Sequence, residues 1–400
     1  MPDPSQHPFA WPRFIITAYG PTLLSQIGYG AITPLVVLSA TSLGASAQIA
    51  ALLIALLGVG TIVGDLPASV VATRLGERMA IVVACLWDAV WLFAAFMATS
   101  LPILAVAVFS FGLSGSVFGL ARQNYITEAV PERYRARMLS TLGGSFRIGA
   151  FIGPLVGAWV IVTWDLQAAY AFAAVMSLTA AGVTLALPDL PSQVLDRRSL
   201  GDGRSRLFTV LRAHGRTFMT LGVGMIGVGL ARAVRQTIVP LWCDSLGMAP
   251  EHTSLVYALS MGVDMSLFFL GGYIMDRFGR VWVVVPSLVI LGLGLAGIAL
   301  THTVVAVSIA AAVLGFGNGI GSGMVMSLGS DASPDVGRAQ FLSGWRLFAD
   351  SGTAIGPTLL SALTGLFSLA TATISLGGFT LISAIWMAYW LIHSPHKNTK

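Results

Sequence analysis

The stretch 271–280, GGYIMDRFGR, joins two long apolar runs of the chain, at residues 252–275 and 281–300. It places one acid and two arginines beside a glycine in a short connection. An apolar run of about 20 residues is long enough to cross a bilayer as a helix. A basic turn between two such runs therefore predicts a helical hairpin whose turn lies at a membrane surface.

The composition of the whole chain agrees with this local pattern. Of the 400 residues, 56% are hydrophobic and only 10% are charged, whereas a soluble protein carries about 25% charged residues. A water-soluble protein and a disordered chain are both excluded. Cys85 and Cys243 stand far apart in apolar segments and form no CxxC or metal-ligand spacing. We expect no metal and no cofactor.

Apolar runs of membrane-spanning length occur twelve times. They lie at about 14–38, 47–72, 79–99, 102–124, 138–163, 167–187, 216–243, 252–275, 281–300, 303–327, 339–365 and 369–392. The first run is too long for a signal-peptide core and lacks a small-residue cleavage site after it, so we expect it to be a retained span. The chain is predicted to be an all-α membrane protein with twelve transmembrane helices.

Lysine and arginine fall on one side of these spans only. The termini and the connections on their side carry residues such as Arg74, Arg135, Arg277 and Arg338, while the loops on the other side carry none. Positive loops remain in the cytoplasm. We therefore expect an inner (plasma) membrane protein with both termini cytoplasmic. The basic residues of the cytoplasmic loops account for the net charge of +5. No nucleic-acid partner is therefore expected.

A shift of 203 residues aligns a set of glycine, arginine and proline residues in the two halves of the chain. The matches include Gly44 with Gly247, Arg74 with Arg277, Gly76 with Gly279, Pro131 with Pro334, Arg135 with Arg338, and Pro154 with Pro357. Six spans per half place both halves in the membrane in the same sense, with a site expected between them. We predict six-helix bundles at 1–187 and 216–400. The cytoplasmic linker 188–215 is either flexible or forms an amphipathic surface helix from Arg204 to Arg212.

The repeated elements resemble the major facilitator superfamily over essentially the whole chain. Its signature Gly-x3-Asp-Arg-x-Gly-Arg is intact between spans 8 and 9, in Gly272, Asp276, Arg277, Gly279 and Arg280. The copy between spans 2 and 3 keeps Arg74 and Gly76 but has Ser69 and Thr73 where the signature has glycine and aspartate. The resemblance implies that the acid caps a helix of the other half and stabilises the outward-facing state. A tight basic turn without that function is the alternative.

A second resemblance lies in span 5, at residues 149–158, GAFIGPLVGA. Gly149, Gly153, Pro154 and Gly157 match the antiporter motif of the twelve-span drug:proton antiporters, with Ala158 in place of the last glycine. Small residues four apart permit close helix packing, and proline bends the helix. The chain departs from that subgroup in two respects. Residues 25–30 of span 1 hold no acid, and residues 111–115 of span 4 hold no arginine.

Charged residues inside the spans mark candidate functional sites, because a charge near the bilayer centre costs at least about 2.5–3.5 kcal/mol. The spans hold Asp65, Asp88, Arg122, Arg147, Arg232, Arg235, Asp264, Arg346 and Asp350. Helix rise places Asp65 level with Arg346, and Arg147 level with Asp264. In the family, these helices face each other across the seam between the halves. Two cross-seam ion pairs are predicted, unless each charge pairs within its own half. For Arg122, a local pair with Glu128 is expected.

The candidate residues fall into three roles. We assign proton coupling to Asp264, Asp350 and Asp65, because a carboxyl can take up and release a proton in the cycle. Arginine keeps its proton and suits anions, so that Arg232 and Arg235 in span 7 are candidates for substrate binding. Gln26, Tyr29 and Asn318 are further candidates. The signature residues, together with Arg122, Arg147 and Arg346, are candidates for a conformational switch.

The function predicted from these features is secondary active transport by alternating access. The span 5 motif favours proton-coupled efflux of a small organic solute or drug. Uptake of an anionic metabolite, or uniport, is the alternative, because the span 7 arginines suit an anion. A membrane-embedded receptor or enzyme is the remaining class. No nucleophile or nucleotide-binding motif is present, so an enzyme is not expected. The expected partners are protons, a small-molecule substrate and the lipid bilayer, with the protein a monomer.

Overall fold

The computed structural model describes residues 11–130, 132–186, 209, 210, 212–334 and 338–393. Helices, and no strands, make up the secondary structure of this part of the chain. The N-terminal half contains α1 (Trp11–Ser42), α2 (Ala47–Leu75), α3 (Glu77–Phe96), α4 (Leu101–Ala129), α5 (Glu132–Thr163) and α6 (Ala168–Leu185). The C-terminal half contains α8 (Gly215–Thr217), the π-helix η1 (Phe218–Gly222), α9 (Val223–Ser245), α10 (Pro250–Phe278), α11 (Val281–Ile298), α12 (Val304–Ile320), α13 (Met324–Ala332), α14 (Arg338–Leu366) and α15 (Leu369–His393).

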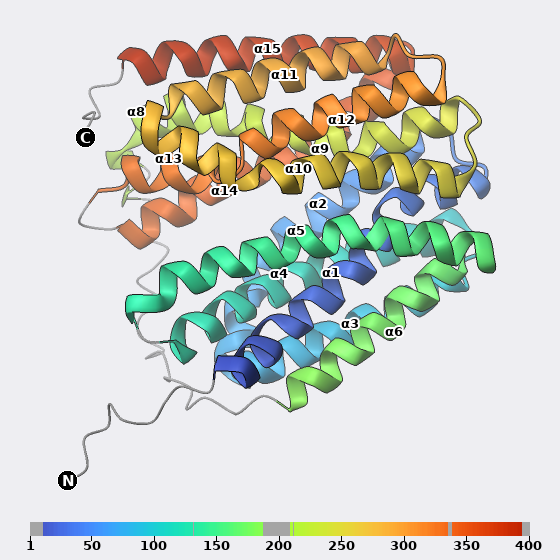
Figure 1. Ribbon diagram of the computed structural model, residues 1–400, viewed down its shortest axis with the longest axis horizontal. Helices are drawn as coiled ribbons and strands as arrows, with labels where there is room; N and C mark the ends of the chain where they lie inside the picture. The colour runs from blue at the N-terminus through green and yellow to red at the C-terminus, as the bar shows by residue number, and fades with distance from the viewer. Residues whose placement is uncertain (1–10, 131, 187–208, 211, 335–337, 394–400) are drawn as a thin grey trace.

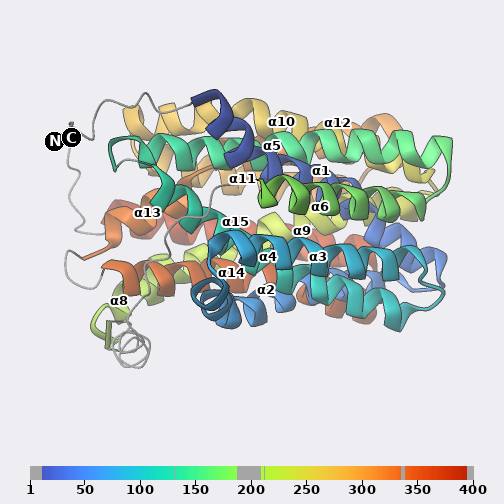
Figure 2. The same cartoon turned by 90° about the horizontal axis from the view of Figure 1, so that it is seen from below.

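The two halves form two bundles that lie side by side, with their long helices along the same axis (Figures 1 and 2). Within the described residues, 11 helical segments are long and apolar enough to cross a membrane. Helix α14 is equally long, but Arg346, Asp350 and several small polar residues lower its hydropathy. Counting α14, the predicted all-α fold of two six-helix bundles is confirmed. The linker predicted at 188–215 falls largely outside the described residues, so the domain boundaries stay a prediction.

Glycines end equivalent helices in the two bundles. Helix α2 ends at Gly76 with φ 77°, and α10 ends at Gly279 with φ 97°. Such positive φ values are easy for glycine and costly for other residues. Both glycines belong to the turn that is repeated in the sequence. The turn needs a residue with positive φ in each half, which explains why glycine occurs at both positions.

The two bundles meet along two seams. Helix α2 packs on α14 at one seam, and α5 packs on α10 at the other. Small residues permit these approaches: a Cβ on Gly58 would lie 2.9 Å from the Cα of Ala354, and a Cβ on Gly262 would lie 2.8 Å from the ring of Phe151. The predicted arrangement, in which spans 2, 5, 8 and 11 flank the seam, is present.

The glycines of the span 5 motif hold α5 against α1. A Cβ on Gly153 would lie 2.6 Å from the carbonyl oxygen of Ile27, and one on Gly157 would lie 2.9 Å from that of Ala31. The equivalent Gly356 of α14 packs on Leu230 of α9 in the same way. The motif therefore positions α1, which lines the interior, against a seam helix.

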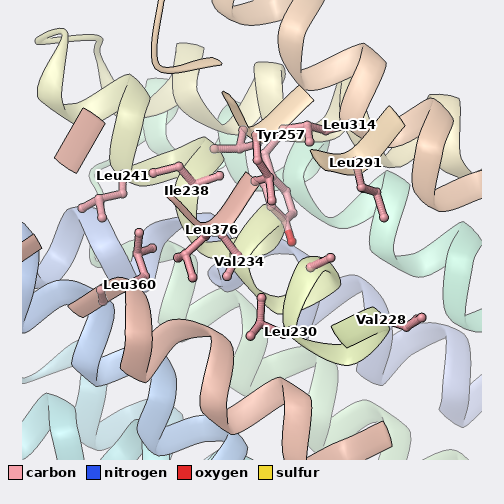
Figure 3. Close-up of a cluster of buried hydrophobic side chains, with 14 of the residues drawn as sticks. Val228, Leu230, Val234, Ile238, Leu241, Tyr257, Leu291, Leu314, Leu360 and Leu376 are labelled. Atoms are coloured by element: carbon pink, nitrogen blue, oxygen red, sulfur yellow. The ribbon is translucent and has the colours of Figure 1, made fainter. Parts of the chain in front are cut away.

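Helix α9 runs through the core of the C-terminal bundle. Figure 3 shows Leu230, Val234 and Ile238 of this helix among side chains from the neighbouring helices, including Tyr257 of α10. All four side chains are buried. This apolar surrounding makes the charged Arg235, on the same helix, costly unless it is paired.

The halves are in contact at one end of the molecule through a pair of side chains. We call the end that carries Arg74 and Arg277 the arginine-bearing end. At the opposite end, Thr41 Oγ1 of α1 donates a hydrogen bond of 3.3 Å to Asp244 Oδ1 of α9. Toward the arginine-bearing end, the Arg346 side chain of the α2–α14 seam is 60% exposed. A side-chain contact thus joins the halves at the opposite end, and Arg346 of the α2–α14 seam is exposed.

Candidate functional site

Asp264 of α10 is the centre of a buried polar cluster at the interface of the halves. Its Oδ1 pairs with Arg147 Nη1 of α5 at 2.5 Å, which joins the N-terminal half to the C-terminal half. Its Oδ2 pairs with Arg235 Nη2 of α9 at 3.1 Å and accepts a hydrogen bond from Asn318 Nδ2 of α12. The carboxylate thus has partners on three other helices. The predicted cross-seam pair of Arg147 and Asp264 is present.

The two arginines that bind Asp264 have different surroundings. Arg235 is 2% exposed, and its Nη1 also donates to Ser260 Oγ at 3.0 Å. Arg147 is 25% exposed and stacks on Phe268, with its guanidinium carbon 4.6 Å from the ring centre. Arg235 is therefore a fixed partner from the same half. Arg147 is a partner from the other half that water reaches.

Arg232 stabilises a break in a membrane helix. Its Nη2 donates to the carbonyl oxygen of Gly321 at 2.8 Å, directly after α12 ends. Gly323, with φ 82°, precedes α13. A broken helix inside a membrane leaves carbonyl groups that need donors, and Arg232 supplies one.

A cavity of about 190 Å³ lies between the halves beside this cluster. Its wall is formed by Gln26, Tyr29, Gly30, Thr33, Phe146, Arg147, Ala150, Gln236, Tyr257 and Met261. Among these residues Arg147 is the one with a formal charge. Tyr29, Thr33 and Gln236 also line a neighbouring space of about 20 Å³. Aromatic faces, amide groups and one guanidinium suit a small organic molecule with polar or anionic groups.

Comparison with known proteins identifies the family. Residues 22–263 and 221–400 match the profile of the Major Facilitator Superfamily. The chain belongs to this superfamily. It is therefore a multi-pass membrane transporter and not an enzyme.

Several relatives and solved structures are similar to this chain. The transporter is 25% identical over 367 residues to the "Na(+), Li(+), K(+)/H(+) antiporter" of Planococcus maritimus, covering 82% of this chain and 81% of that protein. It is 25% identical to the "Multidrug resistance protein MdtH" of Cronobacter sakazakii, over 50% of this chain and 48% of the relative. The structure of a peptide transporter POT in complex with sulfate superposes with a TM-score of 0.79 at 15% identity, over 97% and 96% of the two chains. The nucleoside transporter NupG superposes with a TM-score of 0.77 at 16% identity, over 93% and 98%.

The residues predicted to bind substrate divide between the cavity and the polar cluster. Gln26 and Tyr29 line the cavity. Asn318 and Arg235 bind Asp264 instead, and Arg232 binds the α12 carbonyl. Arg147, which the sequence suggests as a switch residue, lines the cavity as well as pairing with Asp264.

Sequence reasoning missed the other residues of the cavity wall, among them Gln236, Tyr257 and Met261 of the C-terminal half. Gln236 directly follows Arg235 in α9, so its polarity in an apolar span was a signal. Tyr257 and Met261 stand one helical turn apart on α10, and Met261 lies nearly one turn before Asp264. Their side chains carry no charge, and no sequence pattern separates them from ordinary core residues.

The second seam lacks the cross-seam pair predicted from depth. Arg346 Nε binds Asp350 Oδ2 of its own helix at 3.3 Å. Asp65 on α2 lies close enough to Asp350 to act on it electrostatically, but no Asp65–Arg346 ion pair occurs among the described residues. In the described residues Arg346 is therefore engaged by a carboxylate of its own helix.

The signature residues of the transporter interact within the C-terminal half. Arg280 forms a two-point ion pair with Asp331, with Nε–Oδ2 at 2.7 Å and Nη2–Oδ1 at 3.3 Å. This bond raises the pKa of Arg280, because the carboxylate stabilises the charged guanidinium. Arg277 donates to the hydroxyl of Tyr273 at 2.6 Å, and the side chain of Asp276 is exposed.

Arg122 is fully buried near the arginine-bearing end of α4. Its Nε donates to Thr22 Oγ1 of α1 at 2.9 Å. The side chain of Glu128, its predicted partner, lies outside the described residues. The bond to Thr22 holds α4 to α1 within the N-terminal half.

Proposed function

We propose that this transporter exports a small organic solute in exchange for protons, with Asp264 as the proton carrier. The observation that carries the proposal is the Arg147–Asp264 ion pair, which joins the two halves beside the cavity. The relatives named as a cation/proton antiporter and as multidrug resistance proteins favour proton-driven exchange. We also propose that the protein acts as a monomer in the plasma membrane with both termini cytoplasmic.

The pairing of Asp264 links proton binding to movement of the halves. With both arginines in place, the negative charge of Asp264 is paired with two guanidinium groups. Alternating access moves α5 away from α10 and withdraws Arg147, while Arg235 and Asn318 stay in the same half as Asp264. A carboxylate that loses one of two cations in a buried site gains affinity for a proton. Proton binding and release then accompany each change of conformation.

The cavity wall links the solute to the same event. Arg147 is both a wall residue and the partner of Asp264. A solute with an anionic group can take the guanidinium from Asp264, because arginine binds carboxylates with two parallel hydrogen bonds. Occupation of the cavity therefore changes the charge that Asp264 experiences, without direct contact between the solute and the proton.

Proton-coupled uptake of an anionic metabolite is the second candidate. Three arginines, Arg147, Arg232 and Arg235, surround the single carboxylate of Asp264. This excess of positive charge favours anionic or zwitterionic solutes over cations.

Purified transporter in liposomes tests the proposal and separates the candidates. A pH-sensitive dye inside the vesicles reports proton movement on addition of benzoate, a fluoroquinolone, tetraphenylphosphonium, sodium chloride or potassium chloride. Exchange of an organic solute for protons supports the proposed export. Protons and benzoate moving in the same direction support the uptake candidate. Proton movement with the inorganic salts alone contradicts both.

A further inference from the structure

We propose that Asp88 of α3 is a second proton-binding site, located in the N-terminal half. Its role in transport rests on the proposed proton coupling, while its protonation rests on local geometry. Asp88 shares the inward face of α3 with Ala84, Cys85 and Leu92, all of which are buried. Its own side chain is partly buried and contacts Ser114 of α4.

The described hydrogen-bond partner of the Asp88 side chain is the neutral hydroxyl of Ser114. Ser114 Oγ lies within hydrogen-bond distance of Asp88, of the Ser110 carbonyl oxygen at 3.0 Å and of the Phe111 carbonyl oxygen at 3.2 Å. A hydroxyl has one hydrogen, and backbone carbonyls only accept. Serine within a helix donates to the carbonyl of the preceding turn. Ser114 Oγ donates to Asp88 Oδ1, and its single hydrogen is shared with the two carbonyls, so that the carboxyl receives only a shared hydrogen bond from a neutral group.

In the described part of the chain, no arginine or lysine is paired with the carboxyl of Asp88. Among the described residues Asp88 forms no ion pair. Tyr29 from α1 and Cys85 from α3 are the titratable groups on which it acts. Arg122 of α4 binds Thr22 instead, and Ser177 of α6 binds the carbonyl of Cys85. An unpaired carboxylate inside a membrane span is costly, and taking up one proton from water removes that cost.

Two interactions connect Asp88 with residues of the cavity wall. Tyr29, on which it acts electrostatically, lines both cavities. Phe111, whose carbonyl contacts Ser114, lines the smaller one. The position equivalent to Asp88 in the other half is Leu291, which is fully buried. The carboxyl is therefore specific to the N-terminal half.

Infrared difference spectra of the purified full chain, recorded between mildly acidic and alkaline buffer, test this inference. We expect a carbonyl band of a protonated carboxyl in the wild type, which Asp88→Asn removes. Ser114→Ala should shift this band, because its hydrogen-bond partner is lost. Asp264→Asn should leave it in place. An unchanged band in Asp88→Asn overturns the inference. If that variant does not fold, an unshifted band in Ser114→Ala overturns it instead.

The same variants separate this inference from the proposed function. In the vesicle assay, Asp264→Asn addresses proton coupling and leaves the band of Asp88 untouched. If Asp264→Asn transports like the wild type while Asp88→Asn loses the band, the proposed carrier is wrong and the Asp88 site stands. If the band persists in Asp88→Asn while Asp264→Asn loses proton-driven transport, the Asp88 site is wrong and Asp264 stands as the proton carrier.

Discussion

Thr41 and Asp244 occupy the same position in the two repeats, 203 residues apart, and their side chains are hydrogen-bonded to each other at 3.3 Å. Two equivalent positions can touch only close to the axis that relates the halves. This axis therefore leaves the molecule between the ends of α1 and α9, at the end opposite to the arginine-bearing one. Opening that end requires this contact to break.

A disulfide at this position should lock the transporter. In a background without the native cysteines (Cys85→Ala, Cys243→Ala), we expect the pair Thr41→Cys and Asp244→Cys to oxidise readily, because the hydrogen-bonded side chains bring the two backbones close together. Transport in vesicles should stop on oxidation and return on reduction. The single variant Thr41→Cys is the control. Full transport by the oxidised pair would show that this end does not open.

The two arginines bound to Asp264 should respond differently to neutral substitution. Arg235→Gln leaves the buried carboxylate without its fixed partner, and loss of one member of a buried pair costs about 3–5 kcal/mol. We expect a clear loss of thermal stability. Arg147 is partly exposed, so Arg147→Gln should reduce proton-driven transport with a smaller loss of stability. Thermal unfolding and vesicle transport of both variants provide the measurement. The opposite ranking would contradict the assigned roles.

Substrate binding by Arg232 and Arg235 stays a prediction from the sequence. If either binds an anionic solute, its change to Gln should lower affinity about tenfold, since a charge-assisted bond contributes about 1.5–3 kcal/mol. The contacts of Arg232 to Gly321 and of Arg235 to Asp264 favour a structural role. Binding titrations of folded variants decide between these roles, and unchanged affinity with lowered stability would make the arginines structural.

The intact signature should matter more than its incomplete copy. Asp276→Asn removes an exposed charge that the family pattern assigns to latching the halves, whereas Thr73→Ala removes one hydroxyl. We expect the larger loss of transport for Asp276→Asn with stability unchanged, because Asp276 is exposed. Arg280→Gln is the structural control, since it breaks the pair with Asp331. Equal losses of transport for Asp276→Asn and Thr73→Ala would show that Asp276 does not latch the halves.

The Asp65–Arg346 pair, which does not occur among the described residues, should form in another conformation of the transport cycle. Arg346 can turn from Asp350 to Asp65 when α2 approaches α14, because its side chain is 60% exposed. We expect Asp65→Arg and Arg346→Asp each to impair transport and their combination to restore part of it. No rescue by the double variant would contradict this pairing.

The sequence predicts the fold well because its signals are long and repeated. Apolar runs of span length define the helices, and a single offset relates Gly76 to Gly279 and Pro154 to Pro357. Depth along the helices also predicted the pair of Arg147 and Asp264. The same reasoning failed for Asp65 and Arg346, because depth does not specify how far apart two helices stand in a given conformation. Gln236 and Tyr257 were missed because uncharged wall residues look like core residues in a sequence.

The Asp264→Asn variant tests the central claim most directly. Wild type, Asp264→Asn and the control Glu251→Gln, which changes an acid in the first turn of the same helix, are compared in liposomes with an imposed pH gradient. We predict that Asp264→Asn loses accumulation driven by the gradient and retains part of the solute exchange that needs no gradient, while Glu251→Gln behaves as the wild type. Gradient-driven accumulation by Asp264→Asn at the wild-type level would contradict the account.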